Sequence, residues 1–193
     1  AARIRTIALG CDSRITFEAG EKVQVGPDRV VPLALLAARF PRVEKEICDL
    51  KKKGELERRA TDIEYWFLAK TIGSQKGMIA NGNHQKLIAL LEDGPLRLTQ
   101  LLKKMDVYHA LQLNADALIR QGVIEQATLT PTDLLHVTGQ MDIWCGEAAR
   151  QAVDFACALH NRDQAIVVER TLDSIAVTMV KEAILFLGRQ DKP

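Results

Sequence analysis

The chain has 193 residues, 47% of them apolar and 26% charged, a composition typical of a globular protein with one or two domains. Its 26 Lys and Arg residues balance 25 Asp and Glu residues, which excludes a general attraction to nucleic acid or to an anionic membrane. Four cysteines without a Cys-x-x-Cys pair argue against a zinc cluster, and the lack of a leader or long apolar run favours a cytoplasmic setting.

Strand signals dominate the start of the chain. A strand-like run begins at Arg3, and apolar and polar residues then alternate over residues 14–18 and 22–25, which predicts a β-hairpin. Gly26-Pro27 is expected to end this run. Since the first run starts almost at residue 1, we expect the natural protein to extend beyond this segment.

Helix and strand signals follow up to residue 83. Residues 33–39 can form a short helix, and Pro41 is well placed to begin a second helix that a lysine-rich stretch ends. Residues 63–68 form a β-rich apolar run, and a glycine-rich loop is expected over 73–82. We therefore expect residues 1–83 to be a strand-rich region with helices.

Residues 86–123 carry leucines in three groups at helical spacing. Three short helices followed by a strand over 123–129 resemble a winged-helix module, which we assign to residues 84–130. A DNA-binding regulator is one function that this module would suggest. However, residues 86–125 hold five cations and five anions, whereas a DNA-reading helix normally lies in a positive field. We therefore expect the module to serve as a scaffold or as a protein interface, and we expect no nucleic-acid partner.

Residues 131–193 are predicted to be a helical region that packs back on the core, which makes the expected fold class α+β. The second of its two apolar stripes recurs at helical spacing through Leu172, Ile175, Met179, Ala183 and Phe186. We expect this stripe to belong to the core. If it were exposed instead, this region would be a helical interaction domain for another subunit or a second copy of the chain.

Two stretches contain residues suited to chemistry. In the first, a strand ends at Gly10-Cys11-Asp12-Ser13. Such a turn can aim backbone N–H groups and a carboxylate at a ligand, or it can be a plain turn whose acid or hydroxyl bonds local backbone. Gly10, Asp12 and Ser13 are therefore the candidates for cofactor binding.

The second stretch is residues 130–139. Thr130 fits a helix N-cap, Pro131 the first helical position and Asp133 the positive end of that helix, which Gly139 is expected to end. His136 shares the helix face of Asp133, and the pair could orient a proton carrier or half-build a metal site, or simply be structural. No other histidine has a spacing that completes such a site, so we expect no metal ligands here. The candidate catalytic residues are Asp12, Asp133 and His136.

Three blocks, in this order, resemble successive blocks of the hydantoinase/oxoprolinase family: Gly10-Cys11-Asp12-Ser13, residues 25–33 and residues 129–139. The resemblance implies part of an actin-like ATPase fold. For the intact enzyme it implies ATP-dependent hydrolytic opening of a small cyclic amide, such as a hydantoin or 5-oxoproline. ATP would phosphorylate the amide oxygen, and Mg²⁺ or a similar divalent cation would accompany the nucleotide.

Two departures from the family pattern limit what this chain is expected to do alone. Cys11 stands where the family usually has a second glycine, and the family's Asp-x-Gly-Gly-Thr-x-Thr-Asp phosphate-binding stretch does not occur in this sequence. We therefore expect a fragment that holds no tightly bound cofactor and is catalytically silent by itself. The expected partners are the remaining domains of the same protein or a second enzyme subunit, with homo-oligomerisation as a further option and no membrane contact.

Overall fold

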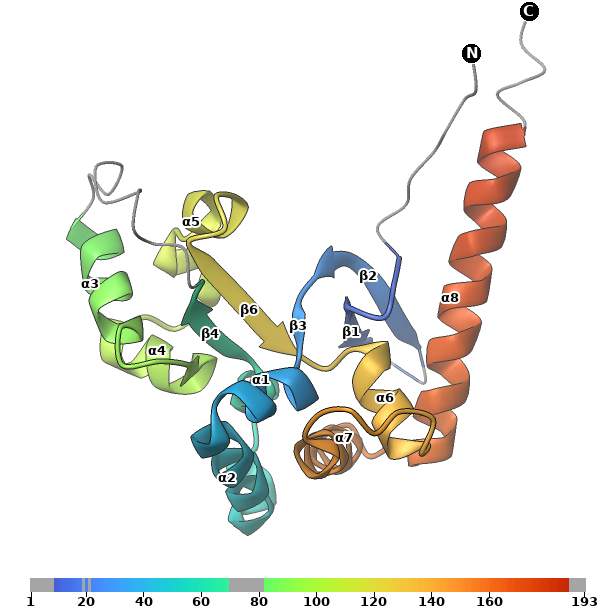
Figure 1. The fold of residues 1–193 in the computed structure, drawn as a ribbon, viewed down its shortest axis with the longest axis horizontal. Helices are drawn as coiled ribbons and strands as arrows, with labels where there is room; N and C mark the ends of the chain where they lie inside the picture. The colour runs from blue at the N-terminus through green and yellow to red at the C-terminus, as the bar shows by residue number, and fades with distance from the viewer. Residues whose placement is uncertain (1–8, 19, 21, 70–81, 188–193) are drawn as a thin grey trace, which may run out of the picture.

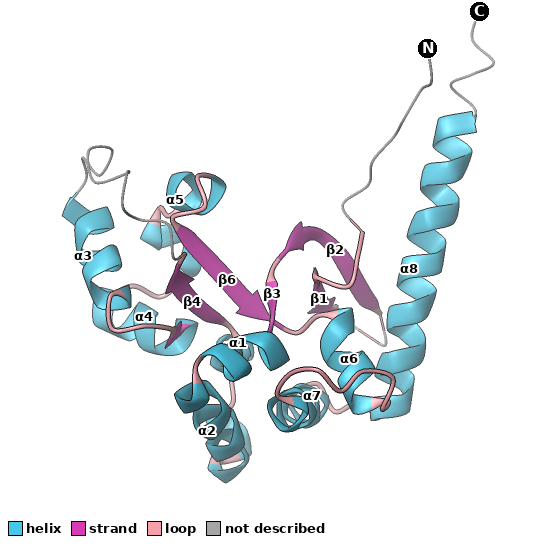
Figure 2. Cartoon of the chain, in the orientation of Figure 1, coloured by secondary structure: helices cyan, strands magenta, loops and turns pink. Residues whose placement is uncertain are grey.

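The computed structural model describes residues 9–18, 20, 22–69 and 82–187. It has two small sheets with helices packed on them (Figure 1, Figure 2), so the α+β class is confirmed. Residues 3–8, expected to belong to the first strand-like run, lie outside the described residues. So does nearly all of the glycine-rich loop expected over 73–82.

The expected hairpin is present as strands β1 (Ser13–Phe17) and β2 (Val23–Arg29), which pair antiparallel. β2 runs through Gly26-Pro27, so the prediction that this dipeptide ends the strand is wrong. Ile15 pairs with Val25 and Ser13 pairs with Arg29. The two pairs are therefore two residues apart on β1 but four residues apart on β2. The extra residues form a bulge, which is the usual way for a strand to accommodate glycine and proline.

A four-stranded sheet forms the centre of the fold, in the order β3 (Val31–Pro32), β6 (Ile124–Thr128), β4 (Tyr65–Leu68) and β5 (Leu96–Arg97). β3 is parallel to β6, and the other neighbours are antiparallel. Successive side chains of a strand point to opposite faces, so β4 sends Tyr65 and Phe67 into one hydrophobic core and Trp66 into another. The sheet therefore separates two cores.

Four helices and the hairpin surround the first core: α1 (Leu33–Arg39), α2 (Pro41–Asp49), α6 (Pro131–Val137) and α7 (Gly146–Leu159). Prolines at the first position of α2 and α6 begin these helices as predicted. The small side chains Ala148, Ala152 and Ala156 are buried along α7 and let its neighbours approach closely. Short 3-10 helices connect α2 to β4: η1 (Leu50–Lys52), η2 (Glu55–Glu57) and η3 (Ala60–Ile63).

The second core lies on the other face of the sheet. It is enclosed by α3 (Gly82–Leu91), α4 (Leu98–Met105), the 3-10 helix η6 (Ala110–Leu113) and α5 (Asp116–Arg120). Of the leucines whose spacing predicts these helices, Leu87, Leu101 and Leu118 are buried in this core, whereas Leu111 is exposed. The first two helices and the following strand are present where the sequence predicts them. The third consists of two pieces, η6 and α5, because Asn114 between them has a left-handed backbone conformation with φ of +51°.

Helix α8 (Gln164–Leu187) begins against α7 and then lies along β2, where the Val25 N–H donates to the Ser174 hydroxyl (3.2 Å). Val167 and Thr171 are buried on this side of the helix. Leu172 and Met179 are exposed, so the prediction that their stripe belongs to the core is wrong. Helix α8 is rotated about its axis so that a different face packs on the rest of the chain. That face carries Val167, Thr171 and Ser174, which recur at helical spacing. Figure 1 shows α8 extending past the body of the described chain.

Candidate functional site

The Gly10–Ser13 turn bonds largely to itself. The Ser13 N–H donates to the Gly10 carbonyl (3.0 Å), and the Gly10 N–H donates to the Ser13 hydroxyl (2.9 Å). The Ser13 side chain is buried. Gly10 and Ser13 therefore satisfy each other as in an ordinary turn, and neither points a free polar group at a ligand. Cys11, in contrast, is exposed.

Asp133 caps two helices at once. Its carboxylate accepts hydrogen bonds from the Thr130 N–H and hydroxyl (2.9 Å each), which belong to the start of its own helix, α6. It also accepts the N–H groups of Leu33 (3.3 Å) and Ala34 (2.8 Å) at the start of α1. Helix α1 has no cap of its own, since Pro32 precedes it and its first turn holds no acid. Asp133 therefore joins α6 to α1 across about 100 residues of sequence.

Burial dominates the electrostatics of Asp133. Its side chain is completely buried, and loss of hydration raises its pKa to about 6, although the four hydrogen bonds from Ala34, Thr130 and Leu33 act in the opposite direction. A carboxylate enclosed by four donors has no accessible oxygen with which to accept a proton from a substrate. The local capping interpretation is therefore the better account of Asp133.

His136 does not pair with Asp133. The imidazole is buried, and within the described chain neither ring nitrogen has a hydrogen-bond partner. Its nearest aromatic neighbour is Trp144, with ring centroids 6.1 Å apart. Burial lowers the pKa of His136, against a smaller opposing effect of Asp142. The structure therefore places this imidazole in the interior, and not beside the Asp133 carboxylate as a proton carrier.

Backbone hydrogen bonds join the first motif to the other two. The Thr132 N–H and hydroxyl both donate to the Cys11 carbonyl (3.1 and 2.7 Å). The Val30 N–H donates to the Asp12 carbonyl (2.8 Å). Together with the Asp133 bonds to α1, these contacts connect residues 10–13, 25–33 and 129–139 pairwise. We call this meeting point the three-block junction.

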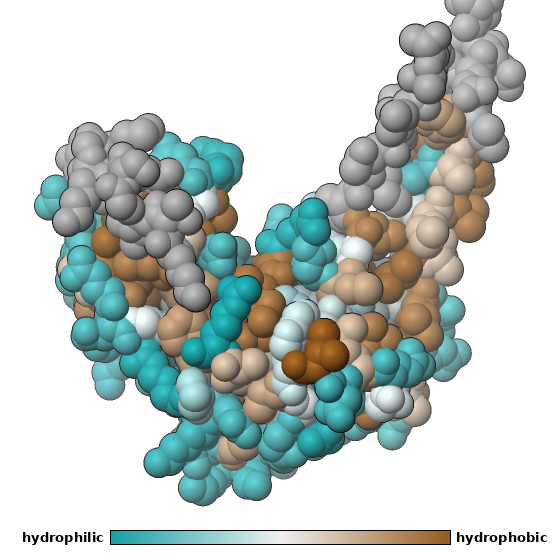
Figure 3. Space-filling view, in the orientation of Figure 1, coloured by the Kyte–Doolittle hydropathy of each residue, from teal (hydrophilic) through white to brown (hydrophobic). Residues whose placement is uncertain are grey.

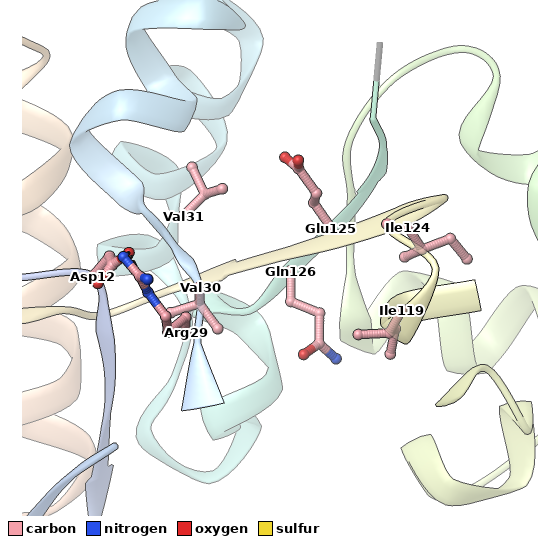
Figure 4. Close-up of a pocket in the computed structure, with 9 residues that line it drawn as sticks. Asp12, Arg29, Val30, Val31, Ile119, Ile124, Glu125 and Gln126 are labelled. Carbon is pink, nitrogen blue, oxygen red and sulfur yellow. Dashed lines mark hydrogen bonds and ion pairs between the residues drawn. The ribbon is translucent and has the colours of Figure 1, made fainter. Parts of the chain in front are cut away.

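The side chain of Asp12 leaves the junction and reaches a pocket. Its carboxylate accepts two hydrogen bonds from the Arg29 guanidinium, one of them from Nε at 2.8 Å, and this pairing raises the pKa of Arg29. The pocket has a volume of about 260 Å³. Besides this ion pair its lining is Val30, Val31, Ile119, Gly122, Ile124, Glu125 and Gln126. Figure 4 shows Asp12 and Arg29 on one side of this pocket and Gln126 and Ile119 on the other.

This pocket, which we call the Asp12–Arg29 pocket, combines an apolar wall with charged and amide groups. Arg29 offers donors and Gln126 an amide, which suits a small polar ligand, whereas the Glu125 side chain points to the opposite side of β6 (Figure 4). The Arg14 guanidinium already donates to the side-chain oxygen Oε1 of Gln126 (3.2 Å) and so orients that side chain. Among the described residues, no group of three or more His, Cys, Asp or Glu side chains is arranged to hold a metal ion.

A second hollow of about 150 Å³ lies between β1, η3, β6 and α7. An Arg14–Glu64 ion pair (2.9 Å) lies at its wall, and His160 stacks on Phe17 with ring centroids 4.5 Å apart. Burial lowers the pKa of His160. None of the residues predicted as functional lines this hollow, although Leu129, at the edge of the junction, does.

The structure thus brings Asp12, Asp133, Gly10 and Ser13 to one region, but only Asp12 lines the pocket. Three further residues that line the pocket, Arg29, Glu125 and Gln126, were not predicted from the sequence. The hairpin register offers the one available signal, since Arg29 pairs with Ser13, next to Asp12. Glu125 and Gln126 approach through the pairing of β3 with β6, two strands about 90 residues apart that no local pattern connects.

Compared with family models, curated proteins and solved structures, the chain matches none. Among the described residues, no helix combines the length and the apolarity that a membrane crossing needs.

Proposed function

We propose that this chain is one part of an ATP-dependent cyclic-amide hydrolase of the hydantoinase/oxoprolinase type. The observation that carries the proposal is the three-block junction. Residues 10–13, 25–33 and 129–139 are the stretches on which the family resemblance rests, and hydrogen bonds connect each of them to the other two. If the three stretches resembled the family only by chance, there would be no reason to expect them to lie in contact in the folded chain.

In this proposal the junction is structural and the Asp12–Arg29 pocket contacts the ligand. ATP with a divalent cation supplies the activating phosphoryl group in such enzymes. The contribution of this chain is orientation, because guanidinium donors and a carboxylate at the edge of an apolar pocket can hold a small polar ring by directed hydrogen bonds. The hairpin and the helices of the first core would then belong to part of an actin-like ATPase fold.

We assign residues 84–130 to a winged-helix-like module that serves as scaffold or protein interface. The order α3, β5, α4, α5, β6 supports this assignment. The central strand β4 departs from a simple module, since it precedes the helices yet lies between β5 and β6. The third helix, α5, carries Arg120 together with Asp116, which is a poor charge pattern for a helix that enters a DNA groove. Duplex DNA at physiological salt should therefore give no retarded band.

The test of the main proposal is ATP turnover by the protein that the native gene encodes, with and without hydantoin or 5-oxoproline. We expect turnover stimulated by a cyclic amide in that protein and none in the 193-residue chain alone. Absence of stimulation by either compound in the gene product would contradict the proposed function. Turnover by this chain alone would contradict its assignment as a part.

A matched pair of variants tests the role of the pocket. Asp12→Asn removes the charge that pairs with Arg29, and we expect it to lower stimulated turnover about tenfold or more, the usual scale for losing a positioned charged group. Asp28→Asn changes an exposed carboxylate on β2, next to Arg29 but outside the pocket lining, and should leave turnover unchanged. Equal turnover in the two variants would remove Asp12 from the site.

A further inference from the structure

Helix α8 carries an apolar surface that the described chain leaves open. It has 24 residues, which corresponds to a length of about 36 Å. Six of its large apolar side chains are between 49% and 63% exposed: Leu172, Val177, Met179, Val180, Ile184 and Leu185. In Figure 3 apolar side chains follow this helix where it leaves the body.

Three of the exposed side chains form an apolar stripe. Val177, Val180 and Ile184 follow one another at steps of three and four residues, so they share one face of the helix. Leu172 and Met179, seven residues apart, share a second exposed face. Between residues 175 and 186 only Thr178, Lys181 and Glu182 are polar. A helix segment that is apolar on most of its circumference is normally buried, so a covering partner is expected.

The charges beside the stripe indicate which partner. Asp173 lies four residues before Val177 and Lys181 four residues after it, and both side chains are exposed. When two copies of α8 pack antiparallel with Val177 at the twofold axis, Asp173 of each copy approaches Lys181 of the other. A parallel pair would place like charges against each other, which is unfavourable.

We propose that α8 is a self-complementary docking surface on which a second copy of this chain packs antiparallel, centred on Val177. An isologous contact of this kind uses the same patch twice and closes after two subunits. Arg170 already pairs with Asp173 on the same helix (3.5 Å), so Lys181 of the second copy would extend an existing ion pair into a network. This inference is independent of the proposed ring-opening activity.

The test is sedimentation equilibrium of the 193-residue chain over a concentration series. We expect a monomer–dimer equilibrium that Val180→Glu weakens about tenfold or more, since it buries a charge in the apolar stripe. Leu56→Glu is the matched control, because Leu56 in η2 is also apolar and exposed but lies on another element. A chain that stays monomeric, or a dimer that both variants affect equally, would overturn the proposal.

A charge reversal tests the antiparallel register. Lys181→Asp should weaken the dimer about tenfold, and Asp173→Lys in the same chain should restore most of the loss, because the pair is then reversed rather than broken. Circular dichroism checks that each variant keeps its helix content. Failure of the second change to restore dimerisation in folded protein would refute the register centred on Val177.

Discussion

Removing the carboxylate of Asp133 should destabilise the fold more than any surface change. Asp133→Ala leaves three backbone N–H groups and the Thr130 hydroxyl without their acceptor in the interior. Each buried donor without a partner costs about 1–3 kcal/mol, and water can reach some of them after the truncation, so we expect a total loss of about 4 kcal/mol. This is a large share of the stability of a typical domain.

Urea unfolding followed by circular dichroism measures this loss. Asp116→Ala is the matched control, because Asp116 is also an acid in the first turn of a helix but is exposed. It should cost about 0.5 kcal/mol, the usual size of a surface charge–helix dipole interaction. If Asp133→Ala costs no more than this control, the description of Asp133 as a cap shared by α1 and α6 is wrong.

The pH dependence of the same variant series gives a second check. Burial raises the pKa of Asp133 from 3.8 to about 6, so between these values the folded chain binds more protons at this residue than the unfolded chain does. The contribution of Asp133 to stability is therefore largest below pH 4 and falls as pH rises through 6, by about 3 kcal/mol in total. Comparing wild type with Asp133→Asn at each pH isolates this change, and a difference that is constant from pH 4 to 7 would refute it.

Three further variants test the neighbouring contacts. Thr132→Val removes the hydrogen bond from the hydroxyl to the Cys11 carbonyl and should lower the free energy of unfolding, measured by calorimetry, by about 1 kcal/mol. No change in melting temperature would show that this hydrogen bond does not contribute to stability. His136→Phe should not lower stability at pH 7.5. Because burial lowers the pKa of His136, wild type should lose stability as pH falls through 6.5 while the variant does not, which thermal melts at pH 7.5 and 5.5 can compare. Asp12→Ala breaks an exposed ion pair with Arg29 and should leave the melting temperature nearly unchanged; a fall of many degrees would mean that Asp12 is structural.

Local patterns predicted the elements well because local forces decide them. A proline stands at the first position of α2 and of α6, because proline fits the first turn of a helix but disrupts its interior. The hairpin follows from alternation, and the end of α6 from Gly139, whose φ of +72° is one that glycine adopts easily. Each of these features involves residues within a few positions of one another.

Features that depend on distant partners were not predictable in the same way. The sequence placed Asp133 only near the positive end of its own helix, and nothing in the pattern indicated that it also caps α1, about 100 residues earlier. The bulge at Gly26-Pro27 depends on register with β1. Which face of α8 is buried also depends on the residues of β2 and α7 that pack against it. An apolar pattern alone does not distinguish a buried face of a helix from an exposed one.

The contrast between two carboxylates decides where chemistry can occur around the junction. Asp133 is buried and accepts four hydrogen bonds from groups that the fold needs to satisfy, so a variant there changes stability before it can report on function. Asp12 is partly exposed, pairs with one side chain, and lines a pocket. A group of this kind can exchange its partner for a ligand at little cost to the fold. Loss of turnover at Asp12 without loss of stability would therefore indicate a functional role, whereas loss of both at Asp133 would indicate only that the junction holds the pocket in place.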